Sequence, residues 1–406
     1  MQFLDSLCVK LLSLLFIGDR LFIGEMRSYT HFQKSDKNLI ETYMKNFLTF
    51  SILSTATFIL SFPFLQAEAV PNNNQNFEQL CLQKNLLLAE TKGIVEAILK
   101  ETGTQDCKLA TSKLNTISEI DFYNNEISDL KLLAELTNLT YLDLRDKQIS
   151  DLKPLAKLTN LTTLRLSGNQ IKDLKPLANL INLETLELSI NQIRDLKPLA
   201  GLKNLVVLDL YDNQISDVKP LMGLTNLNKL SFGNNQIADI TAVGSLTNLS
   251  ELYFYYNQIR NIVPLANLTN LNRLSLEHNK ISDIRPLAGL TKLTWLVLSS
   301  NQITDINSLG SLLNLTSIHF NNNQISDVKP LADLTNLIEL DSTSNKISDV
   351  NPLVDLTNLI ALYLTNNKIS DINPLAGLTS LTQIEVGRNP ISKKVCPVQP
   401  ASICNF

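Results

Sequence analysis

Residues 202–221 read Leu-Lys-Asn-Leu-Val-Val-Leu-Asp-Leu-Tyr-Asp-Asn-Gln-Ile-Ser-Asp-Val-Lys-Pro-Leu, and this stretch decides the fold. The same pattern returns every 22 residues without an insertion, with its first leucine at 114, 136, 158, 180, 202, 224, 246, 268, 290, 312, 334, 356 and 378. We number the positions of each unit from this leucine. Thirteen copies in one register make chance implausible, so we infer that residues 114–391 repeat a single structural unit.

The repeated positions predict a strand followed by a short helical turn. Apolar positions 7 and 9 alternate with positions 6, 8 and 10, which is the period of a strand with one buried face. Position 16 is aspartate in eleven units and position 19 is proline in nine, which resembles an N-cap opening a helical turn on the convex side. A calcium ladder is the alternative for these aspartates, but one carboxylate per coil supplies too few oxygens for Ca²⁺.

Position 12 is asparagine in twelve of the units, and we expect its amide to satisfy backbone groups of neighbouring coils as a ladder. These residues are Asn125, Asn169, Asn191, Asn213, Asn235, Asn257, Asn279, Asn301, Asn323, Asn345, Asn367 and Asn389. Two substitutions break the repeat: Lys147 replaces the ladder asparagine, and Ser342 replaces the core leucine at position 9. A buried ammonium is costly unless its stem carries it outward, so we predict a locally loose coil over 136–157.

This spacing is the leucine-rich-repeat pattern, which predicts an α/β solenoid, a horseshoe of about 13 coils with a parallel β-sheet on its concave face. At strand spacing the sheet is roughly 60 Å long. Open end faces require caps. Residues 70–113 supply a helical N-terminal cap, with helices expected over Phe77–Cys81 and Thr91–Lys100, Gly103 as a stop and Cys107 beyond. Residues 392–406 supply a short C-terminal cap.

Residues 44–69 have the pattern of a secretory signal peptide. Lys45 precedes an uncharged apolar run over 47–65, and Ala67-Glu-Ala69 offers a small-x-small cleavage site. An uncleaved membrane anchor is the alternative, because roughly 19 apolar residues can span a bilayer. Because a signal peptide lies at the N-terminus of a newly made protein, we expect translation to start at Met44 and residues 1–43 to be a mispredicted extension. We therefore expect an exported protein, whether secreted, periplasmic or at the cell surface.

Cleavage after Ala69 removes Cys8 and leaves four cysteines as two pairs at opposite ends of the chain. In an exported chain we read Cys81 with Cys107 and Cys396 with Cys404 as structural disulfides. Metal binding is the less favoured alternative, because neither pair has CxxC spacing or a nearby histidine.

Composition argues against an enzyme or a nucleic-acid-binding protein. The formal charge of −4 is too mild for a polyanion-binding surface, and 44% hydrophobic with 18% charged residues excludes a disordered chain. His278 and His319 are expected two coils apart, roughly 10 Å along the sheet, which is too far for one metal ion. The sequence therefore predicts no catalysis, no metal and no cofactor.

The units Leu-Thr-Asn-Leu-Thr, Asn-Gln-Ile-Ser-Asp and Pro-Leu-Ala closely resemble the internalin-type leucine-rich repeats of bacterial surface and secreted proteins, over about 114–391. The resemblance implies a curved solenoid that binds another macromolecule through its concave face. No Ig-like module or wall anchor follows Ile391 in this sequence, and the cysteine-paired N-terminal cap is unlike that of internalins. The resemblance thus supports a binding role, not host-cell invasion or wall attachment.

Aromatic side chains that carry a polar group lie at positions of the repeat that are not part of the hydrophobic core. Trp295 lies at position 6. All seven tyrosines after residue 70 lie at positions 6, 8, 10 or 11, and they are Tyr123, Tyr141, Tyr211, Tyr253, Tyr255, Tyr256 and Tyr363. The four repeat phenylalanines all lie at core position 9. We predict a partner-binding patch on units five to nine, made of Tyr211, Lys229, Glu251, Tyr253, Tyr255, Tyr256, Arg273 and Trp295. Glu277 and His278 are expected close to this patch.

Two other interpretations stay open. Tyrosine and tryptophan also have high strand propensity on a half-exposed surface. An aromatic surface can stack on sugars, so the alternative function is an envelope-associated structural or glycan-binding protein. The leading hypothesis is a monomeric exported module that binds a protein, with membrane contact only if the apolar segment stays uncleaved.

Overall fold

The computed structural model describes residues 75–122, 127 and 130–406 of the chain. The expected N-terminal extension and signal peptide, over 1–43 and 44–69, lie outside the described residues, as do Tyr123 and Asn125. Among the described helices, none has the length and apolar character needed to cross a membrane.

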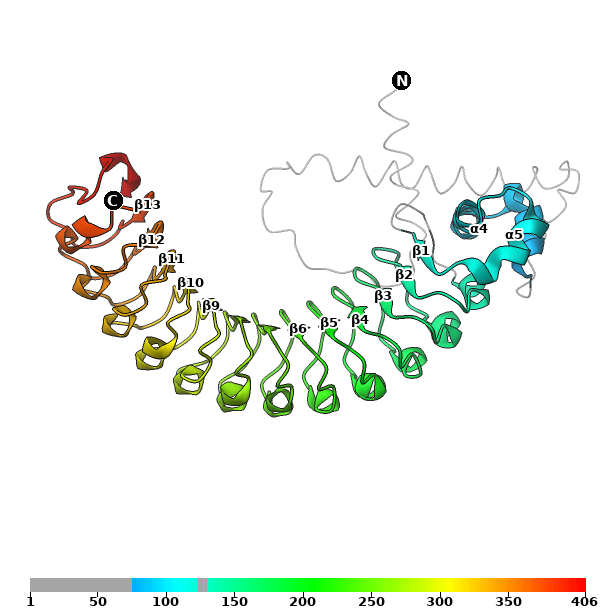
Figure 1. The fold of residues 1–406 in the computed structure, drawn as a ribbon, viewed down its shortest axis with the longest axis horizontal. Helices are drawn as coiled ribbons and strands as arrows, with labels where there is room; N and C mark the ends of the chain where they lie inside the picture. Colours follow the sequence, from blue (N-terminus) through cyan, green and yellow to red (C-terminus); the bar gives the residue numbers. More distant parts are fainter. Residues whose placement is uncertain (1–74, 123–126, 128–129) are drawn as a thin grey trace, which may run out of the picture. The chain divides into compact units, whose positions relative to one another are not determined.

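Within the described part of the chain, the strands form one parallel 14-stranded sheet in sequence order. Its strands are β1 (Glu119–Asp121), β2 (Tyr141–Asp143), β3 (Thr163–Arg165), β4 (Thr185–Glu187), β5 (Val207–Asp209), β6 (Lys229–Ser231), β7 (Glu251–Tyr253), β8 (Arg273–Ser275), β9 (Trp295–Val297), β10 (Ser317–His319), β11 (Glu339–Asp341), β12 (Ala361–Tyr363), β13 (Gln383–Glu385) and β14 (Cys404–Asn405). Figure 1 shows the coils as an arc with this sheet along its inner side. From β1 to β13, residues 22 apart pair across neighbouring strands, as Leu208 pairs with Leu230. The predicted leucine-rich-repeat solenoid is confirmed.

The outer side of each of the first twelve coils carries a short 3-10 turn (Figure 1). These turns are η3 (Lys131–Glu135), η4 (Lys153–Lys157), η5 (Lys175–Leu177), η6 (Lys197–Gly201), η7 (Lys219–Leu221), η8 (Thr241–Ser245), η9 (Val263–Asn267), η10 (Arg285–Leu287), η11 (Asn307–Ser311), η12 (Lys329–Leu331), η13 (Asn351–Leu353) and η14 (Asn373–Gly377). The aspartate at position 16, expected to be the N-cap, lies one residue before the N-cap. In η4 the N-cap is Leu152, and the Asp151 carboxylate accepts the N–H of Lys153 at 3.0 Å. The aspartate still satisfies a backbone donor at the start of the turn.

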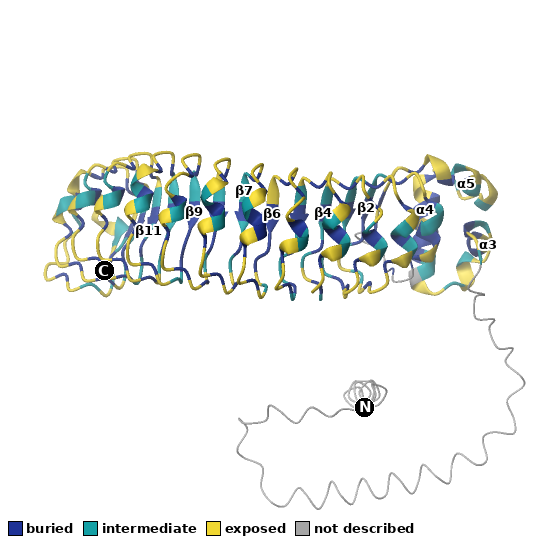
Figure 2. Ribbon diagram, turned by 90° about the horizontal axis from the view of Figure 1, so that it is seen from below, coloured by how far each residue is buried: buried dark blue, intermediate teal, exposed yellow. Residues whose placement is uncertain are grey.

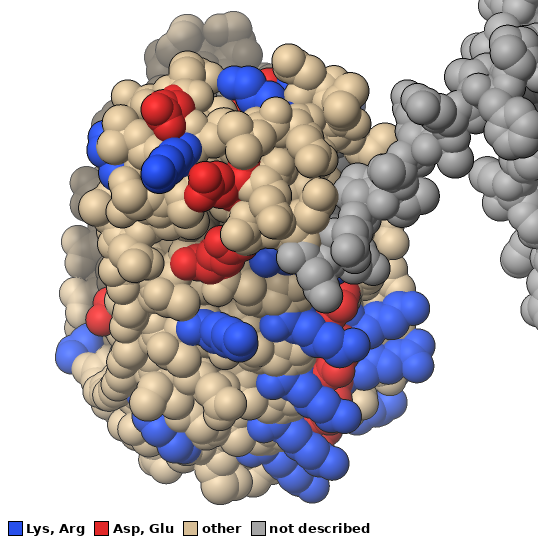
Figure 3. Space-filling model, turned by 90° about the vertical axis from the view of Figure 1, so that its right-hand side faces the viewer, with Lys and Arg blue, Asp and Glu red and all other residues tan. Residues whose placement is uncertain are grey.

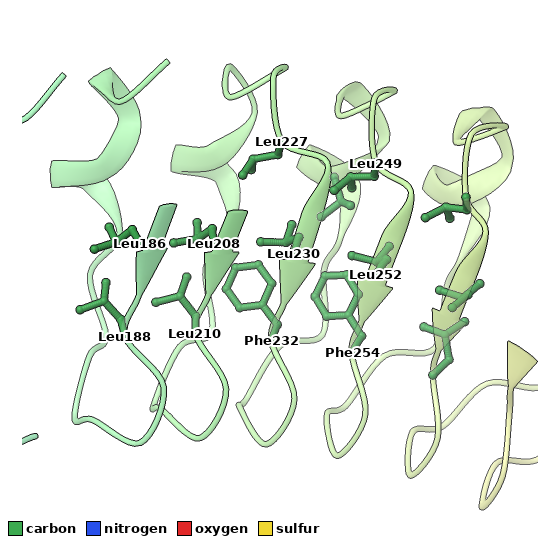
Figure 4. Close-up of a cluster of buried hydrophobic side chains, with 14 of the residues drawn as sticks. Leu186, Leu188, Leu208, Leu210, Leu227, Leu230, Phe232, Leu249, Leu252 and Phe254 are labelled. Carbon is green, nitrogen blue, oxygen red and sulfur yellow. The ribbon is translucent and has the colours of Figure 1, made fainter. Parts of the chain in front are cut away.

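The core is a stack of mainly aliphatic side chains, one layer per coil. Figure 2 shows buried residues recurring from coil to coil along the ribbon. In the unit from Leu202, positions 1, 4, 7, 9, 14, 17 and 20 are all buried. Figure 4 shows position 7 continuing as Leu186, Leu208, Leu230 and Leu252, and position 9 changing from leucine to Phe232 and Phe254. These two phenyl rings stack with centroids 5.4 Å apart. Each coil therefore buries its apolar face only against its neighbours.

The asparagines at position 12 join neighbouring coils by a repeated set of hydrogen bonds. The amide oxygen of Asn213 accepts the N–H of Ile193 at 2.9 Å. Its amide nitrogen donates to the carbonyls of Leu188 and Leu210, at 3.0 and 3.2 Å. Equivalent bonds occur at the other position-12 asparagines from Asn169 to Asn389. The asparagine side chain thus supplies the backbone groups of the turn with the hydrogen-bond partners that strands and helical turns supply elsewhere in the coil.

The turn around Lys147 departs from the others. In most coils one residue, at position 11, has a positive φ, whereas the Lys147 turn has two, Asp146 (φ 60°) and Gln148 (φ 56°). Lys147 is half-buried, and its N–H donates to the amide oxygen of Asn169 at 3.2 Å. The other departure, Ser342, is fully buried, and its hydroxyl donates to the Tyr363 carbonyl at 3.3 Å.

The N-terminal cap contains three helices rather than the two expected. These are α3 (Phe77–Leu82), α4 (Ala89–Glu101) and α5 (Cys107–Lys113), with 3-10 turns η1 (Lys84–Leu86) and η2 (Leu114–Thr116). Cys107, expected to lie beyond the helices, begins α5, and the Asp106 carboxylate accepts the N–H groups of Lys108 and Leu109. A disulfide between Cys81 and Cys107 joins α3 to α5.

The C-terminal cap closes on itself and extends the sheet. Cys396 and Cys404 form a disulfide, and η15 (Ala401–Ile403) precedes β14, which pairs with β13. The tail therefore adds a strand beyond those of the thirteen repeats. Disulfides at both ends constrain the coils that have a neighbour on one side only.

Candidate functional site

The concave face between β5 and β9 carries the predicted patch, which we call the concave patch: Tyr211, Lys229, Glu251, Tyr253, Tyr255, Tyr256, Arg273 and Trp295. Positions 7 and 9 point into the core, so positions 6 and 8 point the other way on each strand. The 22-residue register then sets position 6 of β6, β7, β8 and β9 side by side as Lys229, Glu251, Arg273 and Trp295.

The tyrosines at position 10 lean toward each other across one coil. The ring centroids of Tyr211 and Tyr255 are 5.7 Å apart, although a whole unit separates them in the sequence. The residue between them at position 10 is Gly233, and a Cβ atom there would collide with the Tyr255 ring. Glycine at this point therefore leaves the space in which the Tyr255 ring lies.

Charged and phenolic groups link four neighbouring strands. The Lys229 ammonium lies 3.2 Å from the Glu251 carboxylate, which also accepts the Tyr253 hydroxyl at 3.0 Å. Arg273 Nε donates to the Tyr253 oxygen at 3.3 Å, and its guanidinium lies 4.6 Å from the Trp295 ring centroid. Burial acts to raise the pKa of Glu251, but the bonds from Lys229 and Tyr253 hold that pKa below its ordinary value. The contacts fix the side chains before any partner binds.

A hollow of about 440 Å³ lies within this part of the concave face, and we call it the concave hollow. It is lined by Asp209, Lys229, Ser231, Tyr253, Tyr255, Ser275, Glu277 and Trp295. Asp209, Ser231 and Ser275 were missed in the predicted patch. All three are at position 8, and the signal was the alternation of small side chains with Tyr253 along this column. Tyr211, Glu251, Tyr256 and Arg273 belong to the patch but not to the lining of the hollow.

Tyr256 lies at position 11, in the turn that follows the strand. Its backbone is left-handed with φ 53°, as is that of His278 in the next coil with φ 50°. The two rings stack with centroids 4.1 Å apart. His319, by contrast, lies beside Glu339 at 3.3 Å, so the structure does not bring the two histidines into one site.

A larger hollow of about 840 Å³ follows the edge of the sheet where the strands begin, and it was not predicted. This edge groove is lined by Asn272, Lys292, Thr294, Asn314, Thr316, Asn336, Ile338, Asn358, Ile360 and Ser380. Ile338 and Ile360 are 44% and 45% exposed. Its asparagine amides mostly donate to backbone carbonyls, as Asn336 does to Leu313 at 2.9 Å. The asparagine side chains of the groove therefore serve mainly to join neighbouring coils.

A second charged cluster lies on β2 and β3. The Asp143 side chain is fully buried and pairs with Arg145 at 2.6 Å, with Arg165 at 4.0 Å. Burial opposes its ionisation, but hydrogen bonds from Arg145 keep the pKa of Asp143 below its ordinary value. The cluster satisfies its own charges and so has a structural role.

The convex flank of the early coils is rich in lysine. Position 18 is lysine in five successive units: Lys131, Lys153, Lys175, Lys197 and Lys219. Viewed from the N-terminal cap, basic side chains gather along one flank with acidic ones between them (Figure 3). Interleaved charges of both signs are typical of a solvated flank rather than a polyanion site. Over the described residues, no three His, Cys, Asp or Glu side chains are placed to hold a metal ion.

Comparisons with known proteins agree with this architecture. The chain matches the family model of leucine-rich repeats (two copies) over residues 116–157, 159–201, 203–245, 247–289, 291–333 and 357–396. Among solved structures it is similar to an internalin, InlF, of Listeria monocytogenes, with 36% identity over 74% of this chain and 90% of that one, and a TM-score of 0.72.

Two further solved structures share the fold. A leucine-rich-repeat protein of Leptospira interrogans has 26% identity over 70% of this chain and 82% of its own, with a TM-score of 0.62. The functional domain of InlJ from Listeria monocytogenes has 22% identity over 76% and 77%, with a TM-score of 0.62. No curated protein sequence matches the chain.

Proposed function

Because this chain belongs to the leucine-rich-repeat family and is of the internalin-like bacterial type, we propose that it is an exported, non-catalytic binding protein. Its concave patch recognises a protein partner. The observation that carries this proposal is the continuous run of aromatic and charged side chains across β5 to β9. A leucine-rich-repeat solenoid presents such a surface without using any of its core positions.

The patch has the composition of an interface centre. Tyr253, Tyr255 and Trp295 offer large, rigid contact areas with few rotatable bonds, and such residues dominate binding energy at protein interfaces. Their neighbours already hold them by ring contacts, with Tyr253 and Trp295 centroids 6.2 Å apart. Little side-chain entropy remains to be lost on binding, which favours affinity.

Export is supported by the cysteines. Both pairs form disulfides, at opposite ends of the described chain, and structural disulfides are typical of proteins that fold in an oxidising compartment. The signal-peptide pattern ending at Ala69 is consistent with such a compartment. We propose a monomer that acts outside the cytoplasm after removal of the leader.

The test compares variants of the patch with a matched tyrosine outside it. A partner is first captured by photo-crosslinking from the position of Tyr255, in the native envelope. Its affinity is then measured for the wild type, for Tyr255→Ala with Trp295→Ala, and for Tyr363→Ala. Tyr363 occupies position 8 of a later coil, outside the patch.

We expect the double variant to bind at least 30-fold more weakly, because each anchor at an interface centre contributes about 2 kcal/mol or more. Tyr363→Ala should bind as the wild type does, and all three proteins should keep the same thermal unfolding midpoint. Unchanged affinity in the double variant would show that the partner binds elsewhere. Patch-dependent binding to a glycan array, with no protein captured, would replace the protein partner by a carbohydrate.

A further inference from the structure

Two carboxylates of the concave hollow have no cationic partner. Asp209 on β5 and Glu277 after β8 both line the hollow, and no ion pair involves either within the described residues. Asp209 uses one oxygen to accept the N–H of Tyr211 at 3.0 Å, which orients its side chain. Glu251, by comparison, is already neutralised by Lys229. The hollow therefore has negative charge that the chain itself does not balance.

The cations near the hollow are engaged. Lys229 pairs with Glu251 and lies 5.8 Å from the Tyr253 ring centroid, while Arg273 lies over Trp295. Two of the aromatic rings of the hollow are thus covered by the chain's own cations. No lysine or arginine of the described chain covers the ring of Tyr255. The Tyr255 ring lines the hollow together with the two free carboxylates, and its ring contacts are with Tyr211 and Tyr256 rather than with a cation.

Two serine hydroxyls also line this space. Ser231 and Ser275 are only 9% and 3% exposed as whole residues, and both line the hollow. Neither hydroxyl forms a hydrogen bond in the part of the chain that the structure describes, and neither oxygen is among the buried polar atoms left unpaired there. The two oxygens are therefore open to the hollow and can accept a hydrogen bond. Charged N–H groups are the donors that would bind hydroxyl and carboxylate oxygens most strongly.

The electrostatics of Tyr255 agree with this geometry. Burial raises the pKa of its phenol, and neighbouring negative charge, including that of Asp209 and Glu277, raises it further. The same negative charge that disfavours a phenolate favours a cation at this ring.

We propose that the concave hollow binds the side chain of a lysine or arginine presented by the protein partner. The cationic head group lies against the Tyr255 ring, where the negative charge of Asp209 and Glu277 attracts it from either side, and it donates to whichever oxygen of the hollow lies nearest. Ser231 and Ser275 are two coils apart, so a single head group reaches one of these hydroxyls and not both. This proposal rests on the concave face being the binding surface and names the chemistry that this surface recognises. An anionic group would instead meet two unneutralised carboxylates.

Trp295 provides the reporter for a direct test, because it is the single tryptophan of the chain and lines the hollow. Its indole N–H resonance is followed while the full-length secreted protein is titrated with Nα-acetyl-arginine methylamide or Nα-acetyl-lysine methylamide. The neutral norleucine and acidic glutamate analogues serve as ligand controls. We expect a saturable shift with the cationic probes only, weakening as salt is added.

The variant Asp209→Asn with Glu277→Gln should weaken binding of the cationic probes about tenfold or more. Both substitutions keep size and hydrogen-bonding capacity, so the Tyr211 N–H keeps an acceptor. Asp341→Asn is the matched control, because Asp341 has the same position in β11 and accepts the Thr343 N–H at 2.9 Å. It should bind as the wild type does. An equal response to norleucine, no saturable shift, or an unaffected double variant would overturn the proposal.

Measurements with the captured partner separate this inference from the proposed function. If Tyr255→Ala with Trp295→Ala abolishes partner binding but Asp209→Asn with Glu277→Gln leaves affinity and its salt dependence unchanged, the cation proposal is wrong and the concave surface stands. If neither pair of substitutions affects the partner, the proposed function itself fails.

Discussion

Replacing Asn213 by alanine tests how much the asparagine ladder contributes to stability. The Ile193 N–H would lose its acceptor, the Asn213 amide oxygen at 2.9 Å. A buried donor left unpaired costs about 1–3 kcal/mol. The carbonyls of Leu188 and Leu210 would lose one donor each but keep another, from Asn191 and Asn235 respectively. Each of these losses costs about 0.5–1 kcal/mol. We expect the free energy of unfolding to fall by about 3 kcal/mol.

Two measurements check this value. Urea unfolding gives the overall change, and hydrogen exchange followed by mass spectrometry locates it, because a solenoid can open locally without unfolding as a whole. Exchange should accelerate most around Ile193. The matched control is Asn204→Ala, which removes an exposed asparagine whose amide donates to the Ile181 carbonyl at 3.0 Å. Its cost should stay below about 1 kcal/mol. Equal costs at Asn213 and Asn204 would refute the ladder argument.

Three further substitutions probe the coils. Lys147→Asn should raise the free energy of unfolding by about 1–2 kcal/mol, because the new asparagine completes the ladder. In the wild type, amide hydrogen exchange over residues 136–157 should be faster than over 158–223. Equal protection of the two segments from exchange would contradict the prediction of a loose coil. Ile190 is 51% exposed and has a φ of 55°, a backbone conformation that strains a β-branched residue. Ile190→Asn should therefore raise the free energy of unfolding by about 1 kcal/mol, which the midpoint of urea unfolding measures. Asp143→Asn should cost about 2 kcal/mol at neutral pH. Because the folded pKa of Asp143 is lowered, its stabilisation exists above the ordinary value of 3.8 and is lost as pH falls through the folded pKa, so pH-dependent unfolding of the two proteins should converge in acid.

The repeat architecture was predictable because a 22-residue period without insertions determines the register. Once Leu208 and Leu230 occupy the same position of adjacent coils, their strands pair without any further information. The elements that were missed lack such support. Helix α5 has seven residues, and its start at Cys107 depends on a single aspartate cap. Strand β14 has two residues, and it exists because β13 offers an unpaired edge. Short elements made by tertiary contact leave little periodic signal.

The same register explains how much of the site was predictable. Lys229, Glu251, Arg273 and Trp295 share position 6, so reading one column of the repeat places them side by side. The concave hollow was not predictable in this way. Its shape depends on where side chains are small, as at Ser231 and Ser275, and on how the larger ones orient. Sequence position determines which face a residue occupies, but packing determines which way an aromatic ring lies.

Fold and recognition use separate residues of the same unit, which is why binding chemistry can vary without loss of the solenoid. Trp295 and Leu296 are adjacent in β9, yet one lies on the concave face and the other is fully buried in the stack. Since each coil packs only on its neighbours, a defect such as that at Lys147 in the second unit does not reach the fifth to ninth units directly. Gly233 is the exception to this separation. It lies outside the core, but its missing side chain gives Tyr255 its place, so a change there would alter the patch while leaving the coils intact.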